Sequence, residues 1–132
     1  MRKKSQLFFY FVLWLIIIPY ISSGQIPNQI AAGFKAGDAK VVASHFNENI
    51  QLTILDHENI CSQAQAEQIL KDFFLRNKPS DFQITHQGGE ASVYAIGKLT
   101  TSGGNFRVYF LLKPKSNPAH AGLITQLRID KD

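Results

Sequence analysis

His86 is the main candidate for acid–base chemistry in this 132-residue chain. A histidine in an apolar pocket can act as an acid or a base near neutral pH. Alternation along Phe82-Gln83-Ile84-Thr85-His86 would place its side chain on the same side of a strand as Phe82 and Ile84. We therefore consider two roles for His86, a general acid or base and a hydrogen-bonded residue of the core.

Two further clusters contain residue types that bind metals or act as nucleophiles. Asp56, His57 and Glu58 are adjacent, so on a turn their side chains point in different directions, and we expect no metal site. Cys61 is the single cysteine, which excludes an internal disulfide. Its spacing to His57 or His86 is not that of a thiol nucleophile and its base. We expect Cys61 to be a small buried residue of the core.

The element that would position His86 is a run of three strand-like segments between Phe82 and Lys113. Gly88-Gly89 and Gly103-Gly104 divide this run, and a two-residue Gly-Gly loop can adopt the positive φ of a tight hairpin. Folding the chain about both pairs puts Ala95 on the same face in each hairpin, which favours a curved antiparallel sheet. The expected opposite pairs are His86 with Ala91, Ile84 with Val93, Phe82 with Ala95, Leu99 with Val108, Gly97 with Phe110, and Ala95 with Leu112.

Around this meander the sequence predicts three helices and two more strands. The apolar spacing after Pro27 and the stop at Gly37-Asp38 indicate two short helices, the second over 39–46. Ser62-Gln63-Ala64-Gln65 has the spacing of a capping box and begins a longer helix that ends before Pro79. Strands are expected over 50–54 and 123–130, a turn over 56–59 and a loop over 114–122. The predicted order α-α-β-α-β-β-β-β makes a single α+β domain.

The first 24 residues have the pattern of a secretory signal peptide. Arg2-Lys3-Lys4 precedes an apolar run of twelve residues, Leu7 to Ile18, and the small residues Ser22-Ser23-Gly24 follow. A membrane-spanning helix needs about 20 apolar residues, so we favour cleavage over an uncleaved anchor. We expect cleavage after Gly24, export to the periplasm or the medium, and a folded domain over residues 25–132.

Cleavage would remove much of the positive charge of the chain. Three of the 14 basic residues precede the cleavage point, which leaves 11 basic against 10 acidic residues. No basic stripe remains in the rest of the sequence, so we expect no binding to nucleic acid, and none to membranes after cleavage.

Several short motifs accompany this order of elements: Gly37-Asp38, Ser62-Gln63-Ala64-Gln65-Ala66, Phe73-Phe74, His86-Gln87-Gly88 and Tyr94-Ala95-Ile96-Gly97. With them, residues 26–130 resemble the nuclear transport factor 2-like (cystatin-like) superfamily and, more narrowly, a bacterial family of small exported proteins of unknown function. The resemblance implies helices on the concave face of the sheet and a conical cavity beneath them. The superfamily includes isomerases, dehydratases, transport adaptors and non-catalytic binding domains, so the fold does not decide the function.

The predicted strands place four residues on the inward face as candidates to line such a cone: His86, Gly97, Phe110 and Thr125. Gly97 would either leave room for a small ligand or let an aromatic ring lie on the backbone. The ketosteroid-isomerase branch works with a carboxylate base, a tyrosine and a protonated acid inside the cone. That set is missing here, because Tyr94 is predicted to face outward and Asp38 and Asp56 are explained as a helix cap and a turn residue.

The outward face of the predicted sheet is less polar than a solvated sheet should be. Its candidate interface residues are Tyr94, Ile96, Tyr109, Leu111 and Ile124. The resemblance implies a homodimer that pairs through this face. The alternative is an ordinary surface with scattered apolar groups.

From the sequence we favour an exported, non-enzymatic binding or interaction domain that takes a small apolar ligand or a protein partner, and we expect no cofactor. The alternative is an isomerase-like or dehydratase-like enzyme that uses the cone, with His86 as acid or base and Thr125 or Tyr94 orienting the substrate. A cone filled by side chains would favour the interaction domain. An open cone in which His86 is hydrogen-bonded to a second titratable group would favour the enzyme.

Overall fold

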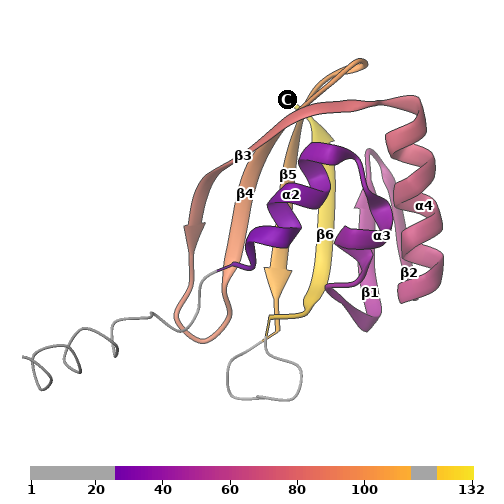
Figure 1. Cartoon of the computed structure of the whole chain (residues 1–132). Helices are drawn as coiled ribbons and strands as arrows, with labels where there is room; N and C mark the ends of the chain where they lie inside the picture. The colour runs from indigo at the N-terminus through magenta and orange to yellow at the C-terminus, as the bar shows by residue number, and fades with distance from the viewer. Residues whose placement is uncertain (1–25, 114–121) are drawn as a thin grey trace, which may run out of the picture.

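Figure 1 shows the computed structural model of the chain, which describes residues 26–113 and 122–132. Its elements are α2 (Asn28–Ala36), α3 (Ala39–Ala43), β1 (Phe46–Ile54), β2 (His57–Ser62), α4 (Gln63–Arg76), β3 (Pro79–Gly88), β4 (Tyr94–Thr101), β5 (Gly104–Leu112) and β6 (Ile124–Lys131). The predicted signal peptide and nearly all of the predicted loop over 114–122 lie outside the described residues. Within the described ranges, no helix is long and apolar enough to cross a membrane.

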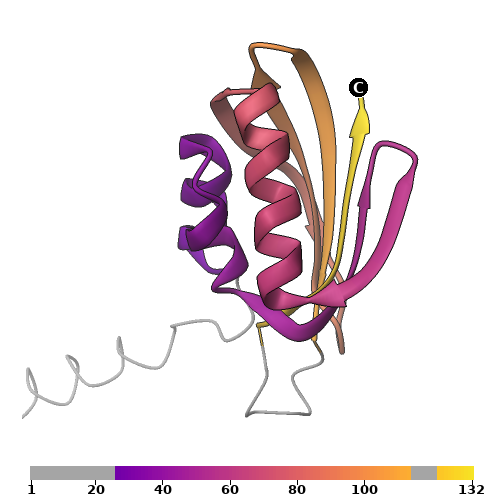
Figure 2. The same cartoon turned by 90° about the vertical axis from the view of Figure 1, so that its right-hand side faces the viewer.

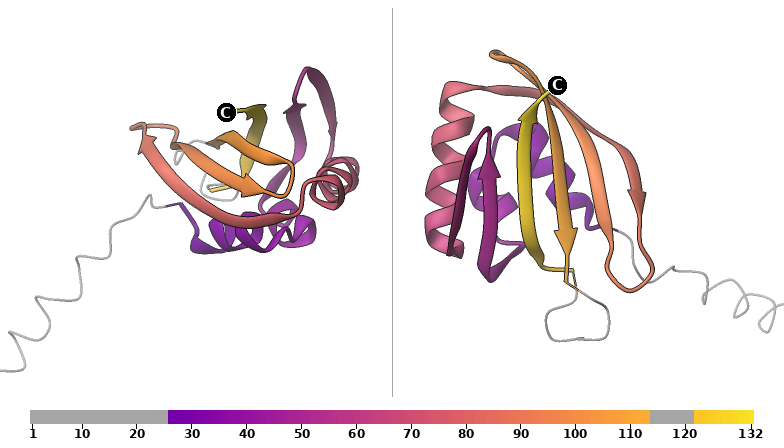
Figure 3. Two further views of the ribbon diagram at one scale, coloured as in Figure 1. Left: turned by 90° about the horizontal axis from the view of Figure 1, so that it is seen from above. Right: turned by 180° about the vertical axis from the view of Figure 1, so that it is seen from behind.

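The six strands form one curved, unclosed sheet in the order β2-β1-β6-β5-β4-β3. Neighbouring strands are antiparallel except β1 and β6, which are parallel. The helices cover the concave face (Figures 1 and 2), and the right-hand view of Figure 3 shows the face that they leave open, with β2 at one edge and β3 at the other. The α+β class and the placing of the helices confirm the prediction from the sequence.

The edge strand β2 is an addition to the predicted order. Leu55 and Asp56 make a two-residue turn, in which Leu55 has a left-handed φ of 53°, and the chain then returns as a strand where a turn over 56–59 was expected. Four of the six residues of β2 are exposed. An edge strand with so few buried side chains shows no apolar alternation, which is why the sequence did not reveal it.

The first hairpin of the meander differs from the prediction in its register. Gly88 pairs with Tyr94, so the chain turns through residues 89–93 rather than through a two-residue Gly-Gly loop. A β-bulge then separates the pair Ile84 and Gly97 from the pair His86 and Ile96. The extra residue reverses the alternation, because successive side chains of a strand point to opposite faces. His86 therefore lies on the outward face, and its predicted place in the cone is wrong.

The second hairpin keeps the predicted faces but changes the partners. Thr101 pairs with Gly104, so the turn residues are Ser102 and Gly103. The pairing moves by two residues and puts Val108 opposite Gly97. A shift of two leaves every side chain on its predicted face, because the side-chain period of a strand is also two.

A second bulge lies in β6, and because of it two predictions for this strand are wrong. Leu111 pairs with Gln126 and Leu112 with Ile124, so Thr125 is the extra residue. Ile124 consequently faces the core, where it is fully buried, and its predicted place on the outer face is wrong. Thr125 is half-buried and its hydroxyl donates to the Leu111 carbonyl oxygen at 3.3 Å, so it does not line the cone as predicted.

Helix α4 begins as the sequence predicts. The Ser62 Oγ accepts a hydrogen bond from the Gln65 backbone N–H at 3.2 Å, and the Ser62 backbone N–H donates to Gln65 Oε1 at 3.1 Å. This reciprocal capping box satisfies two amides that have no partner inside the helix. Asp38 caps α3 in a similar way, because its Oδ1 accepts from the Val41 N–H at 3.2 Å.

Candidate functional site

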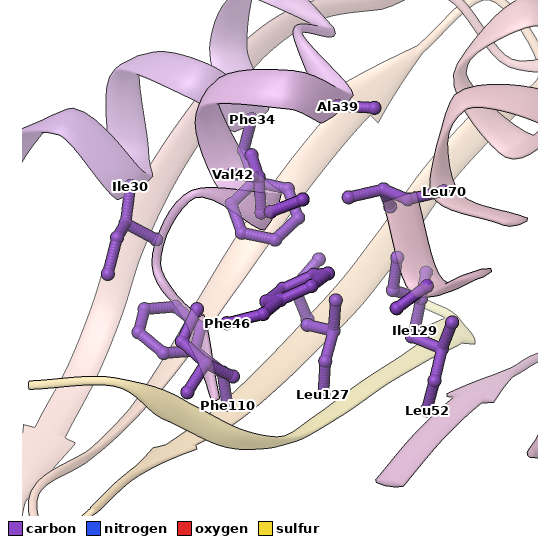
Figure 4. Packing of buried hydrophobic residues seen from close by; sticks show 14 of the residues in the cluster. Ile30, Phe34, Ala39, Val42, Phe46, Leu52, Leu70, Phe110, Leu127 and Ile129 are labelled. Atoms are coloured by element: carbon purple, nitrogen blue, oxygen red, sulfur yellow. The ribbon is translucent and has the colours of Figure 1, made fainter. Parts of the chain in front are cut away.

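The inside of the cone is filled by aromatic and aliphatic side chains (Figure 4). The Phe34 ring is stacked on Phe82 at a centroid distance of 4.9 Å, and Phe110 lies 6.2 Å from it. Phe74 meets the same ring edge-on at 6.1 Å. Stacked and edge-on rings at these distances leave no space between them for a ligand.

Gly97 and Phe110 face inward, as predicted. A Cβ atom added to Gly97 would lie 2.4 Å from the Phe82 Cζ, so a ring does lie on the glycine backbone. The ring is that of Phe82 rather than Phe110. Of the two predicted uses of Gly97, the structure therefore shows ring packing rather than room for a ligand.

Polar groups are nearly absent from this interior. Thr101 is the one buried polar residue among the described positions. Its hydroxyl donates to the Gly104 carbonyl oxygen at 2.8 Å and accepts from the Gly103 N–H at 3.0 Å. Both bonds close the β4–β5 turn, so this hydroxyl is committed to structure.

His45, between α3 and β1, was not a candidate from the sequence. Its Nε2 is buried and has no hydrogen-bond partner in the described part of the chain. Burial lowers the pKa of the imidazole, because the charged form loses its hydration. A lone neutral imidazole without a neighbouring acid is not equipped for general acid–base catalysis.

Cys61 belongs to the core cluster, as predicted. Burial raises the pKa of its thiol, so the nucleophilic thiolate is disfavoured. Across residues 26–113 and 122–132, no three His, Cys, Asp or Glu side chains come together in a group that could hold a metal ion.

Two hollows lie on the surface rather than in the cone. One of about 660 Å³ lies between the α2–α3 corner and α4, and charged side chains including Lys40, Glu67, Lys71 and Lys78 rim it. The other, of about 380 Å³, lies between β2 and α4.

The outward face of the sheet gathers an aromatic and apolar group that we call the outer patch. It consists of His86, Tyr94, Ile96, Tyr109 and Leu111. In the β-ladders, Tyr94 is directly opposite Leu111, Ile96 is opposite Tyr109, and His86 is opposite Ile96. Four of these residues were predicted for this face from alternation alone. His86 joins them because of the bulge in β3.

The rings of the outer patch hold one another in place. The Nε2 of His86 and the hydroxyl of Tyr94 are hydrogen-bonded at 3.0 Å, with the ring centroids 5.7 Å apart. Tyr94 lies 6.2 Å from Tyr109 at an interplanar angle of 32°. A tyrosine anchored in this way presents contact area at a low cost in side-chain entropy.

Positive charge borders the outer patch on β4 and β5. Lys98 is directly opposite Arg107, and like charges in this position repel each other. Arg128, opposite Tyr109, pairs with Asp130 at 2.7 Å. Neither Lys98 nor Arg107 forms an ion pair within the described ranges. The border therefore carries cations that an acidic group could neutralise.

Several proteins with solved structures share this fold. A DUF4783 family protein from Bacteroides fragilis is 33% identical, with a TM-score of 0.76 over 82% of this chain and 100% of its own. A DUF4783 family protein from Bacteroides ovatus is 32% identical, with a TM-score of 0.75 over 83% of this chain and 98% of its own. An NTF2-like protein of unknown function from Cytophaga hutchinsonii is 14% identical, with a TM-score of 0.55 over 84% of this chain and 95% of its own, which shows the shared fold.

No match is found among curated proteins. The family model described as "Domain of unknown function (DUF4783)" matches residues 27–130, nearly the whole of the predicted domain. The chain therefore belongs to the DUF4783 family and has the nuclear transport factor 2-like fold expected from its sequence.

Proposed function

We propose that this chain is an exported, non-enzymatic interaction domain that binds a protein partner through the outer patch. The observation that carries the proposal is the contrast between the two faces of the sheet. The inward face is packed with side chains around Phe34 and Phe82, whereas the outward face presents two tyrosines, a histidine and two aliphatic side chains together. Clustered aromatic groups of this kind are enriched at the centres of protein interfaces.

The surroundings of the outer patch indicate the chemistry of the partner. Apolar side chains on the partner would fit against Ile96 and Leu111, and acidic residues would fit Lys98 and Arg107 at the border. Complementary charge at the rim of an interface raises the association rate and fixes orientation more than it adds affinity. We therefore expect a partner whose binding surface combines apolar and acidic residues.

The alternative, an enzyme that uses the cone, loses support from the position of its acid–base residue. His86 is exposed, on the face away from the helices, and its hydrogen-bond partner there is Tyr94 rather than a carboxylate. The inward side of the sheet around Gly97 is occupied by Phe82. His86 does have a titratable hydrogen-bond partner, Tyr94, but the pair lies on the outward face, so it gives no support to catalysis inside the cone.

A pair of matched leucine variants tests the proposal. Leu111→Lys places a charge in the outer patch and should reduce recovery of the partner from the native host by about tenfold or more, with the urea midpoint nearly unchanged. Leu75→Lys makes the same change at a 75% exposed residue of α4 and should leave recovery as in the wild type. His86→Ala should weaken recovery less than Leu111→Lys. Equal recovery with both leucine variants would overturn the assignment of the outer patch.

Export is the second part of the proposal and rests on the charged start and the apolar run before Gln25. The family match supports it, because the matched region begins at residue 27, just after the expected cleavage point. N-terminal sequencing of the protein recovered outside the cytoplasm should begin at Gln25. Recovery of the uncleaved 132-residue chain in the membrane fraction would contradict this expectation.

A further inference from the structure

The two edges of the sheet are protected to very different degrees. β3 begins with Pro79 and contains two irregularities in its pairing with β4. Proline and bulges are devices by which proteins keep an edge strand from pairing with another chain. β2 has neither, since its six residues, His57–Ser62, contain no proline or lysine and pair with β1 in an unbroken register.

The backbone groups that β2 leaves free can be assigned from its neighbours. The Leu55 N–H donates to the Ile129 carbonyl oxygen on β6, so the odd-numbered residues of β1 face β6 and the even-numbered ones face β2. Hydrogen-bonded pairs alternate along an antiparallel ladder. The N–H and C=O groups of Glu58 and Ile60 therefore point away from β1, toward the open edge.

The hollow beside this edge is lined by no charged residue. The hollow of about 380 Å³ between β2 and α4 is lined only by Asn59, Ile60, Cys61, Gln65, Gln68 and Ile69. The Ile60 side chain is 82% exposed on the other face of β2. The Glu58 carboxylate, the one formal charge on the strand, is turned toward its own β1, where it accepts a hydrogen bond from Gln51 Nε2.

We propose that the β2 edge pairs with the β2 edge of a second copy of this chain. The pairing is antiparallel about a twofold axis, because an isologous contact brings the same surface to itself. It joins the two sheets into one and brings the two α4 helices side by side along the uncharged hollow. The uncharged lining of the hollow favours a second copy, since like charges there would repel their own counterparts. Glutamine and asparagine amides both donate and accept hydrogen bonds, so these side chains on one copy can bond to the same side chains on the other.

Ile60→Pro tests the edge directly. The substitution removes the N–H that points to the open side and adds a ring there, while the ladder to β1 keeps its hydrogen bonds. Ile60→Thr is the matched control, because it shortens the side chain and keeps the amide. The experiment uses residues 25–132. Two relatives with solved structures consist of little more than this domain, because the match covers 98–100% of their chains and 82–83% of this one.

Sedimentation velocity over a range of concentrations gives the readout. The wild-type domain and Ile60→Thr should form a concentration-dependent dimer, and Ile60→Pro should remain a monomer with the wild-type circular dichroism spectrum. Leu111→Lys should still form the dimer. A wild-type monomer at every concentration, a dimer that persists in Ile60→Pro, or a dimer broken by Leu111→Lys alone would each overturn the proposal.

Gln68 on α4 provides a second test that does not alter a strand. Gln68→Lys and Gln68→Glu each bring two like charges together across the twofold axis, and each should raise the dimer dissociation constant by about tenfold. An equimolar mixture of the two variants should restore the dimer, because opposite charges then meet. Mixing without recovery, or no effect of either charge, would contradict this placing of the helices.

Discussion

His45 is a residue whose protonation the fold opposes. Its Nε2 is buried without a hydrogen-bond partner in the described structure, and burial lowers its pKa below the ordinary value of about 6.5. A buried polar atom without a partner costs stability, so this imidazole is tolerated rather than required. The charged ring would lose part of its hydration in this buried position.

The lowered pKa of His45 predicts how stability depends on pH. Below the ordinary histidine pKa, the unfolded chain binds a proton that the folded chain still excludes, so the free energy of unfolding decreases as pH falls from about 6.5 toward the folded-state pKa. Well above pH 6.5 both states are neutral at this residue and its contribution is constant. Urea unfolding of wild type and His45→Phe at pH 7 and pH 5.5 should show a smaller loss in the variant.

Stability at neutral pH gives a second expectation for the same variant. At pH 7, His45→Phe should be as stable as the wild type or more so, because it removes the unpaired nitrogen. The same pH slope in His45→Phe and wild type would contradict this account.

At the scale of elements, the contact between Phe82 and Gly97 fixes how β3 lies on β4. A Cβ on Gly97 would lie 2.4 Å from the Phe82 ring and 3.0 Å from the Gln83 carbonyl oxygen. Gly97→Ala should therefore destabilise the fold by about 1–3 kcal/mol, as overpacking does. The urea midpoint of the variant measures the effect.

A double-mutant cycle separates this contact from the general cost of a glycine substitution. Phe82→Leu removes the ring that the new methyl group would meet, so the double variant should be more stable than the sum of the single effects predicts. Couplings between residues in contact are typically about 0.5–3 kcal/mol. Strict additivity would show that the ring does not lie on Gly97.

Two features of the sheet could not be predicted from the sequence, and both are single extra residues in strands. Alternation predicted β4, β5 and the faces of their side chains correctly, even though the turn at Ser102-Gly103 differs from the one expected. The sequence gives no sign of the bulges at Thr85 and Thr125, because a threonine suits a regular strand equally well. Each bulge reversed the strand end beyond it, moving His86 outward and Ile124 inward.

The same reasoning explains how much of the site was predictable. Tyr94, Ile96, Tyr109 and Leu111 share a face because they alternate with buried residues on two adjacent strands, and this alternation is written in the sequence. His86 belongs with them only through a tertiary feature, the bulge. The filling of the cone also depends on three-dimensional packing, since Phe34 on α2 meets Phe82 on β3 only once the helices cover the sheet.

At the scale of the whole molecule, the helices and the inward face of the sheet make the core, and the working surfaces lie elsewhere. The outer patch spans β3, β4 and β5 at one side of the sheet, and the open edge of β2 lies at the other end of the strand order. In our account, a partner and a second copy therefore bind at separate places. Two copies joined at β2 would present two outer patches, which would strengthen the capture of a partner that has more than one site.

Site-specific photo-crosslinking in the native host tests the central claim most directly. A photoreactive phenylalanine analogue replaces Tyr109 in the outer patch, and in a second strain it replaces Leu75 on α4. The account predicts one discrete adduct with a different protein from position 109, suppressed by Leu111→Lys, and no adduct with that protein from position 75. No adduct from position 109, or the same adduct from both positions, would contradict the claim that the outer patch is the binding surface.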